Sequence, residues 1–227
     1  MIRLHDVTLH PARRDAPILR NANAIFHPRE KVGILAPVGS GKSSIARLIC
    51  GAERPDSGSI ERAGRVSWPI GLAGPFHAEL GIIENLGLIA DLLGEDRDGL
   101  IAFCLSFCDF GQAIEGRMKD LTPAQRACLA YACSLAVVCD IYVADETLTV
   151  GDADLRAKCD ALLERRLRRS GLIFLSRNPS QLSQRCTRFY VLLGGKLISC
   201  RTPEIGQEAL RLAAATEREE KEMLHAG

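Results

Sequence analysis

One short segment limits what this chain can fold into more than any other. It reads Ala36-Pro37-Val38-Gly39-Ser40-Gly41-Lys42-Ser43, and the apolar run 31–36 leads into it. The glycine spacing lets successive backbone N–H groups turn toward one point, and a lysine and a hydroxyl follow where a helix, 42–50, is expected to begin. The segment matches the phosphate-binding loop pattern at every defined position except the first, where Ala36 replaces glycine.

The phosphate-binding interpretation gives several positions a role. Lys42 would reach the β- and γ-phosphates of a nucleotide, and Ser43 would supply an oxygen to Mg²⁺. Ala36 precedes proline, which favours an extended backbone that a residue with a Cβ adopts readily. The alternative is a glycine-rich turn that merely joins a strand to a helix. The residues expected to contact the nucleotide here are Pro37, Val38, Gly39, Ser40, Gly41, Lys42, Ser43 and Ser44.

An acidic pair follows a second apolar run, 141–144. Asp145 closes this expected strand, as a second carboxylate that holds Mg²⁺ would, and Glu146 could polarise an attacking water as a general base. Such a pair alone is more often a solvated loop. Together with a phosphate-binding loop upstream it predicts nucleotide hydrolysis, with Ser43 and Asp145 as metal ligands.

Strand and helix patterns alternate along the chain, which predicts an α/β protein with an antiparallel portion. An inserted helical lobe is expected over about 78–138, because apolar residues recur there at helical spacing and Thr122-Pro123 marks a helix start. A single domain, 1–227, is expected. The expected strands are 2–9, 18–26, 31–36, 59–60, 65–68, 141–144, 172–175, 189–193 and 196–199, and further helices are 154–169 and 207–225.

Composition excludes some classes of function. Lys and Arg number 29 against 28 Asp and Glu, so no general attraction to nucleic acid or to an anionic membrane is expected. The start of the chain lacks a signal-peptide pattern, and no apolar run is long enough to span a bilayer, which predicts a cytoplasmic protein without membrane insertion. The nine cysteines include no Cys-x-x-Cys pair, so free thiols in a reducing compartment are expected.

The chain resembles the ATP-binding subunits of ABC transporters, and most closely those that energise capsular polysaccharide export. The resemblance covers nearly the whole length. Its more discriminating elements are Trp68-Pro69-Ile70-Gly71 and Val150-Gly151-Asp152, and it is also carried by segments 54–60, 84–85, 129–136 and 145–153.

The resemblance implies a P-loop NTPase core of ABC ATPase type that binds ATP and Mg²⁺. Two subunits are expected to sandwich ATP, each site combining the P-loop and Asp-Glu pair of one subunit with a signature loop of the other. The expected partners are a transmembrane permease and a second ATP-binding subunit, in a homodimer or a heterodimer. The expected location is the inner face of the cell membrane, held there through the permease.

Several positions depart from the family pattern at this site. The signature loop corresponds to Thr122, Ala124 and Gln125, and Pro123 within it has no N–H to give to a γ-phosphate. His77 stands where a glutamine would contact Mg²⁺ and the lytic water. Arg177 replaces the histidine expected after Ser176; it would hold the γ-phosphate but could also pair with Glu146. No aromatic residue stands near His10 or Pro11 to stack on adenine.

These residues leave two functions open. The first is a working transport ATPase, with Glu146, Arg177 and His77 at the reacting end of the nucleotide. The second is a catalytically impaired subunit with a structural or regulatory role beside a complete ATPase partner. A soluble ABC protein that acts on DNA or ribosomes is disfavoured, because the charge is near neutral and the chain has no second P-loop.

Overall fold

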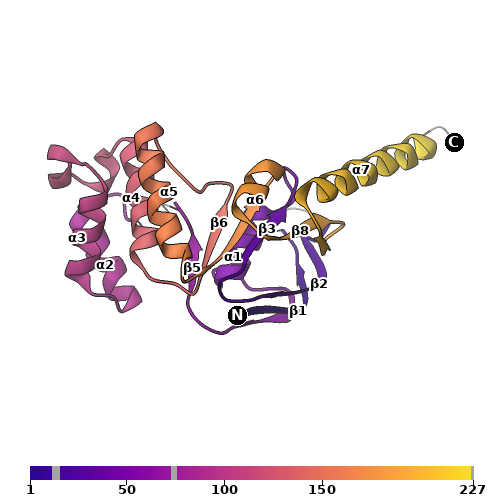
Figure 1. The fold of residues 1–227 in the computed structure, drawn as a ribbon, viewed down its shortest axis with the longest axis horizontal. Coiled ribbons are helices and arrows are strands. Elements are labelled where there is room, and N and C mark those ends of the chain that lie inside the picture. The colour runs from indigo at the N-terminus through magenta and orange to yellow at the C-terminus, as the bar shows by residue number, and fades with distance from the viewer. Residues whose placement is uncertain (12–15, 73–75, 226–227) are drawn as a thin grey trace.

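Two β-sheets form the centre of the protein, and the computed structural model describes residues 1–11, 16–72 and 76–225 (Figure 1). The larger sheet has the strand order β5-β6-β7-β3-β8-β9, which are Val66–Pro69, Ile141–Asp145, Gly171–Ser176, Lys31–Leu35, Arg188–Leu193 and Lys196–Cys200. All of its pairs are parallel except β8 with β9. The smaller, antiparallel sheet has the order β2-β1-β4, which are Leu19–Phe26, Ile2–Leu9 and Ser57–Arg62. The predicted α/β fold with an antiparallel portion is confirmed.

Strand β3 lies inside the larger sheet, paired in parallel with β7 on one side and β8 on the other. Its last four residues are buried, as expected of a strand covered on both faces. Because β6, β7 and β3 run in the same direction, their carboxyl ends lie at one edge of the sheet. The segments after these strands are where ligands bind in open α/β sheets, and they include the predicted loop and acidic pair.

Helix α1, Lys42–Cys50, follows β3 and packs on the sheet. Its buried residues are Ile45, Ala46, Leu48 and Ile49, which share one apolar core with the inner residues of β1, β2, β3 and β6. Gly51 ends the helix at φ +87°, a conformation that glycine adopts without steric cost. The bounds of this helix agree with the prediction.

The helical segments within the predicted lobe gather at one end of the protein (Figure 1). They are α2, Ile82–Leu93; α3, Arg97–Phe107; the short 3₁₀ turns Gly111–Glu115 and Met118–Asp120; and α4, Pro123–Ala136. Thr122 caps α4 and Pro123 is its first residue, as predicted. The buried Tyr131 hydroxyl donates a 2.9 Å hydrogen bond to the Cys159 carbonyl oxygen, which ties α4 to α5, Ala153–Leu167.

Two helices differ from the prediction. Helix α6, Pro179–Arg185, was not predicted, although Asn178 caps it and Pro179 opens it; it is short, and Leu182 is its one buried residue. Helix α7, Pro203–His225, begins earlier than the predicted 207. A proline at the first helical position is a favourable start that the prediction did not use there.

The cysteines are all free, and seven of the nine are buried. Burial raises the pKa of Cys186 to about 12, so this thiol stays protonated and unreactive at neutral pH. Within the described ranges, no helix is both long and apolar enough to cross a membrane.

Candidate nucleotide-binding site

The loop between β3 and α1 has a backbone that only glycine fits at its tightest point. Gly39 and Gly41 have φ values of +75° and +93°. A Cβ on Gly41 would lie 2.7 Å from Ile18 Cδ1, so a side chain is excluded by space as well as by backbone conformation. Ala36 is buried, and its N–H donates to the Ser176 carbonyl oxygen at 3.1 Å. The replacement of glycine by Ala36 is therefore compatible with a turned loop.

Lys42 lies across this loop with only 10% of its side chain exposed. Its Nζ donates to the carbonyl oxygens of Pro37 at 2.9 Å and Ala36 at 3.3 Å. The same nitrogen lies 3.1 Å from Glu146 Oε1. The cation is thus positioned at the mouth of the loop, where phosphate oxygens would take over from these three acceptors.

Ser43 and Asp145 lie together although they come from different elements. The Ser43 hydroxyl donates to Asp145 Oδ2. The other carboxylate oxygen, Asp145 Oδ1, is buried without a hydrogen-bond partner among the described residues. An orphaned carboxylate oxygen beside a hydroxyl is the hard-oxygen donor set that Mg²⁺ prefers, so these residues fit the metal predicted here.

Glu146 has a strained backbone. Its φ is +63°, a left-handed conformation that costs a non-glycine residue about 1–3 kcal/mol. The Glu146 N–H donates to the Leu175 carbonyl oxygen at 2.8 Å, which helps to hold this conformation. Strain of this kind often marks functional positions. The left-handed backbone of Glu146 sets the direction in which its side chain points from the edge of the sheet, and the carboxylate lies beside Lys42.

The anticipated pair between Arg177 and Glu146 is absent from the described part of the chain. Glu146 pairs with Lys42, whereas Arg177 is exposed and has no ion pair among the described residues. The reason is that Lys42 is already held beside Glu146 by the loop carbonyls, while Arg177 begins the exposed turn after β7. Arg177 therefore remains free to meet a ligand.

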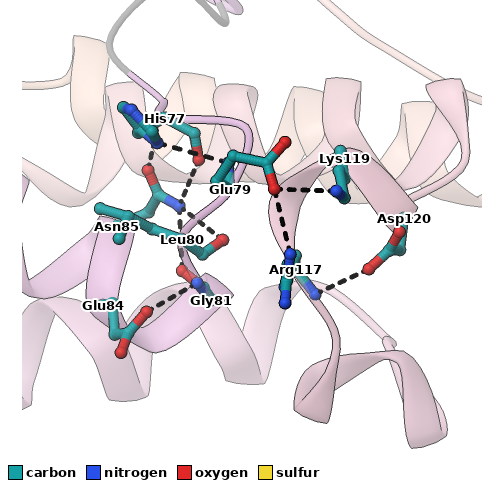
Figure 2. A network of polar contacts seen from close by, with 9 residues as sticks. All are labelled: His77, Glu79, Leu80, Gly81, Glu84, Asn85, Arg117, Lys119 and Asp120. Atoms are coloured by element: carbon teal, nitrogen blue, oxygen red, sulfur yellow. Dashed lines mark hydrogen bonds and ion pairs between the residues drawn. The ribbon is translucent and has the colours of Figure 1, made fainter.

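His77 lies in a loop that a buried amide holds in place (Figure 2). Asn85, only 1% exposed, accepts the His77 N–H through Oδ1 at 2.7 Å. Its Nδ2 donates to the carbonyl oxygens of His77, Leu80 and Gly81 at 3.1, 3.2 and 2.9 Å. The His77 ring is exposed, and its Nδ1 accepts the Glu79 N–H at 3.3 Å. The sequence analysis did not predict this structural role of Asn85. The feature that could have indicated it is a single amide side chain within a helix that is otherwise mostly apolar.

The same loop is tied to the turn before α4. Glu79 Oε2 pairs with Lys119 Nζ at 2.8 Å and with Arg117 at 3.1 Å (Figure 2). The hydrogen bond from Lys119 is the main cause that lowers the pKa of the Glu79 carboxyl below its ordinary value. These pairs are exposed, so they orient the loop more than they stabilise the fold.

The segment Thr122–Gln125 lies in the helical lobe, outside the lining of the pocket around Lys42. Thr122 Oγ1 accepts the Gln125 N–H at 3.2 Å, and Gln125 Oε1 accepts the Thr122 N–H at 3.0 Å. These reciprocal bonds form a capping box. Thr122, Pro123 and Ala124 are exposed, so this end of α4 can meet another surface.

Comparison with known proteins assigns the chain to a family. The ABC transporter family model matches residues 19–149, which include the loop, Lys42 and the acidic pair. The chain belongs to the ABC transporter family. Proteins of this family bind ATP.

Curated relatives narrow the comparison within the ABC family. The ATP-binding protein BexA of Haemophilus influenzae is 36% identical over 198 residues, covering 86% of this chain and 91% of the relative. The capsule polysaccharide export ATP-binding protein CtrD of Neisseria meningitidis is 38% identical over 181 residues, covering 79% and 83%. The polysialic acid transport ATP-binding protein KpsT of Escherichia coli is 34% identical, covering 74% and 78%. The predicted resemblance to capsule-export ATP-binding subunits is confirmed.

Solved structures support the fold. The dimeric ATP-binding cassette MJ0796, in a post-hydrolysis state bound to ADP and Pi, has a TM-score of 0.71 at 19% identity. The match covers 87% of this chain and 96% of that chain. The architecture is therefore that of an ABC ATPase cassette.

Proposed function

We propose that this ABC protein is the ATP-binding subunit of an exporter for capsular or other cell-surface polysaccharide. The observation that carries the proposal is that Ser43 bonds Asp145 beside the Lys42–Glu146 pair, with one buried Asp145 carboxylate oxygen left without a partner among the described residues. The polysaccharide cargo rests on relatives named for capsule export and polysialic acid transport. A permease partner and a position at the inner face of the membrane are part of the same proposal, and membership of the ABC transporter family supports them.

Each residue of the site has a separate role in binding and hydrolysing ATP. Lys42 exchanges the Pro37 and Ala36 carbonyl oxygens for phosphate oxygens, a stronger charge-assisted contact. Ser43 Oγ and Asp145 would hold Mg²⁺, whose charge offsets that of the phosphates. Release of Lys42 frees the Glu146 carboxylate to orient a water and accept its proton. His77 and Arg177 belong to the loops that would approach the γ-phosphate.

A second candidate is a subunit that binds ATP but turns it over slowly beside a complete partner. Pro123 opens α4 without an N–H for a phosphate of the opposite subunit, and Arg177 is a permanent cation. In a heterodimer these changes would affect the two sites unequally. In a homodimer both sites would carry all of them.

Export is tested by deletion in the organism that encodes the chain. We expect the deletion strain to lose surface polysaccharide and to accumulate it inside the cell, as measured by surface and total polysaccharide assays. The parent chain should restore export, and Lys42→Ala should not. Unchanged surface polysaccharide in the deletion strain would contradict the proposed cargo while leaving ATP binding untouched.

Arg177→His separates the two candidates. Histidine can exchange a proton near neutral pH and arginine cannot, so we expect the single-turnover hydrolysis rate of the purified chain to rise by about tenfold or more. Arg168→His, an exposed arginine at the end of α5, is the matched control and should change nothing. A rise of this size favours the impaired subunit, whereas an unchanged or lower rate in Arg177→His would show that Arg177 does not limit turnover and favours the working ATPase.

A further inference from the structure

The nucleotide pocket has an apolar wall that lies away from the phosphate-binding residues. A cavity of about 790 Å³ opens beside Lys42, within the size range of small-molecule sites. The phosphate-binding loop forms one end of it. Its other apolar lining includes Pro17 and Ile18 before β2, Leu193 at the end of β8, and Leu210, Ala213 and Ala214 of α7.

Close packing at the start of α7 sets the position of this wall. Gly206 is buried, and a Cβ there would lie 3.2 Å from Val191 Cβ and 3.4 Å from Leu35 Cδ2. The helix therefore contacts β8 and the end of β3 closely, directly before it reaches the pocket. Leu210, Ala213 and Ala214 have the spacing of one helix face. Beyond them α7 extends away from the body, opposite α2 and α3 (Figure 1).

The two parts of the cavity differ in chemistry. The phosphate end carries Lys42, Ser43 and turned backbone N–H groups. The apolar residues of the wall have no side-chain donor or acceptor. The alanines are small, and Ala213 is only half-buried, so they leave the helix surface open to a flat group. None of the described lining residues is aromatic.

We propose that the base of the bound nucleotide packs on the Ala213 and Ala214 face of α7 together with Pro17 and Ile18. This inference rests on the proposed function, since it deepens the same site. The base is then held by dispersion and burial of apolar surface, not by hydrogen bonds from side chains. Such a wall discriminates weakly between purines, so Mg-ATP and Mg-GTP bind with similar affinity.

The test compares ligands with and without a base. Calorimetric titration of the full chain with Mg-ATP, Mg-GTP and Mg-tripolyphosphate is carried out on the parent, Ala213→Leu and Ala215→Leu. Ala215→Leu is the matched control, because Ala215 is exposed on α7 and is not in the pocket lining. Ala214→Leu is a second variant, at an exposed position where added bulk does not disturb packing.

We expect the parent to bind Mg-ATP and Mg-GTP within about threefold of each other and more tightly than tripolyphosphate. Ala213→Leu and Ala214→Leu should weaken both nucleotides by about tenfold, because the added methyl groups occupy the place of the base, and leave tripolyphosphate unchanged. Ala215→Leu should match the parent.

Three results would overturn the inference. If both pocket-side variants bind Mg-ATP as the parent does, α7 does not contact the base. If they weaken tripolyphosphate as much as Mg-ATP, the helix supports the phosphate loop instead. A parent that prefers one purine by more than about a hundredfold must read the base through hydrogen bonds. Failure of the parent to bind any of the three ligands would instead contradict the proposed function itself.

Discussion

Replacing Lys42 by alanine is expected to weaken Mg-ATP binding by at least about a hundredfold, or ~2.7 kcal/mol. Lys42 supplies a cation with only 10% of its side chain exposed, and charge-assisted hydrogen bonds to phosphate are among the strongest side-chain contacts. The variant also leaves Glu146 without its counter-charge, so a negative group would then face the phosphates. Equilibrium titration with Mg-ATP measures the effect directly.

The matched control is Lys31→Ala. Lys31 begins β3, at the opposite end of the strand from the loop, and pairs with Glu164 on the surface. Its loss removes the same formal charge without touching the loop, so Mg-ATP affinity should stay within about twofold of the parent. Equal affinity of parent and Lys42→Ala would mean that nucleotide, if bound at all, is not held by this loop.

Much of this site could be predicted because its chemistry is local in sequence. The loop at 36–43 needs a strand, two glycines, a lysine and a hydroxyl in fixed order, and all of these lie within one short segment. Gly51 in the sequence also predicts where the following helix, α1, ends. Parallel strand order then brings Asp145 to the same edge, which requires only that β6 be recognised as a buried strand.

The parts that could not be predicted depend on contacts between distant segments. Glu146 pairs with Lys42 and not with Arg177, which depends on where the loop carbonyls hold the lysine. Asn85 entered the prediction only as part of the family resemblance, with no role of its own, yet it is buried and donates to three carbonyl oxygens of the His77 loop. No local pattern connects the α7 alanines with Ile18. Their meeting at the pocket follows from the close packing of Gly206 on β8.

The Glu146→Gln substitution should separate binding from chemistry. The amide keeps the size of the side chain but cannot accept a proton from water, so hydrolysis should fall by about a hundredfold or more. Mg-ATP binding should persist or tighten, because the neutral amide no longer competes with phosphate for Lys42 Nζ. Single-turnover hydrolysis and equilibrium binding of Mg-ATP, measured on the same preparation, give the two quantities.

Glu115→Gln makes the same chemical change at an exposed position in the helical lobe and should leave both quantities unaltered. If Glu146→Gln hydrolyses Mg-ATP as fast as the parent, then Glu146 is not the base and its strained backbone has another origin. If the parent itself hydrolyses nothing while binding Mg-ATP, Glu146→Gln can still tighten binding through Lys42. A parent that binds Mg-ATP without hydrolysis, together with tighter binding by Glu146→Gln, would favour the impaired subunit. In that case Glu146 would compete with phosphate for Lys42 but would not accept a proton from water.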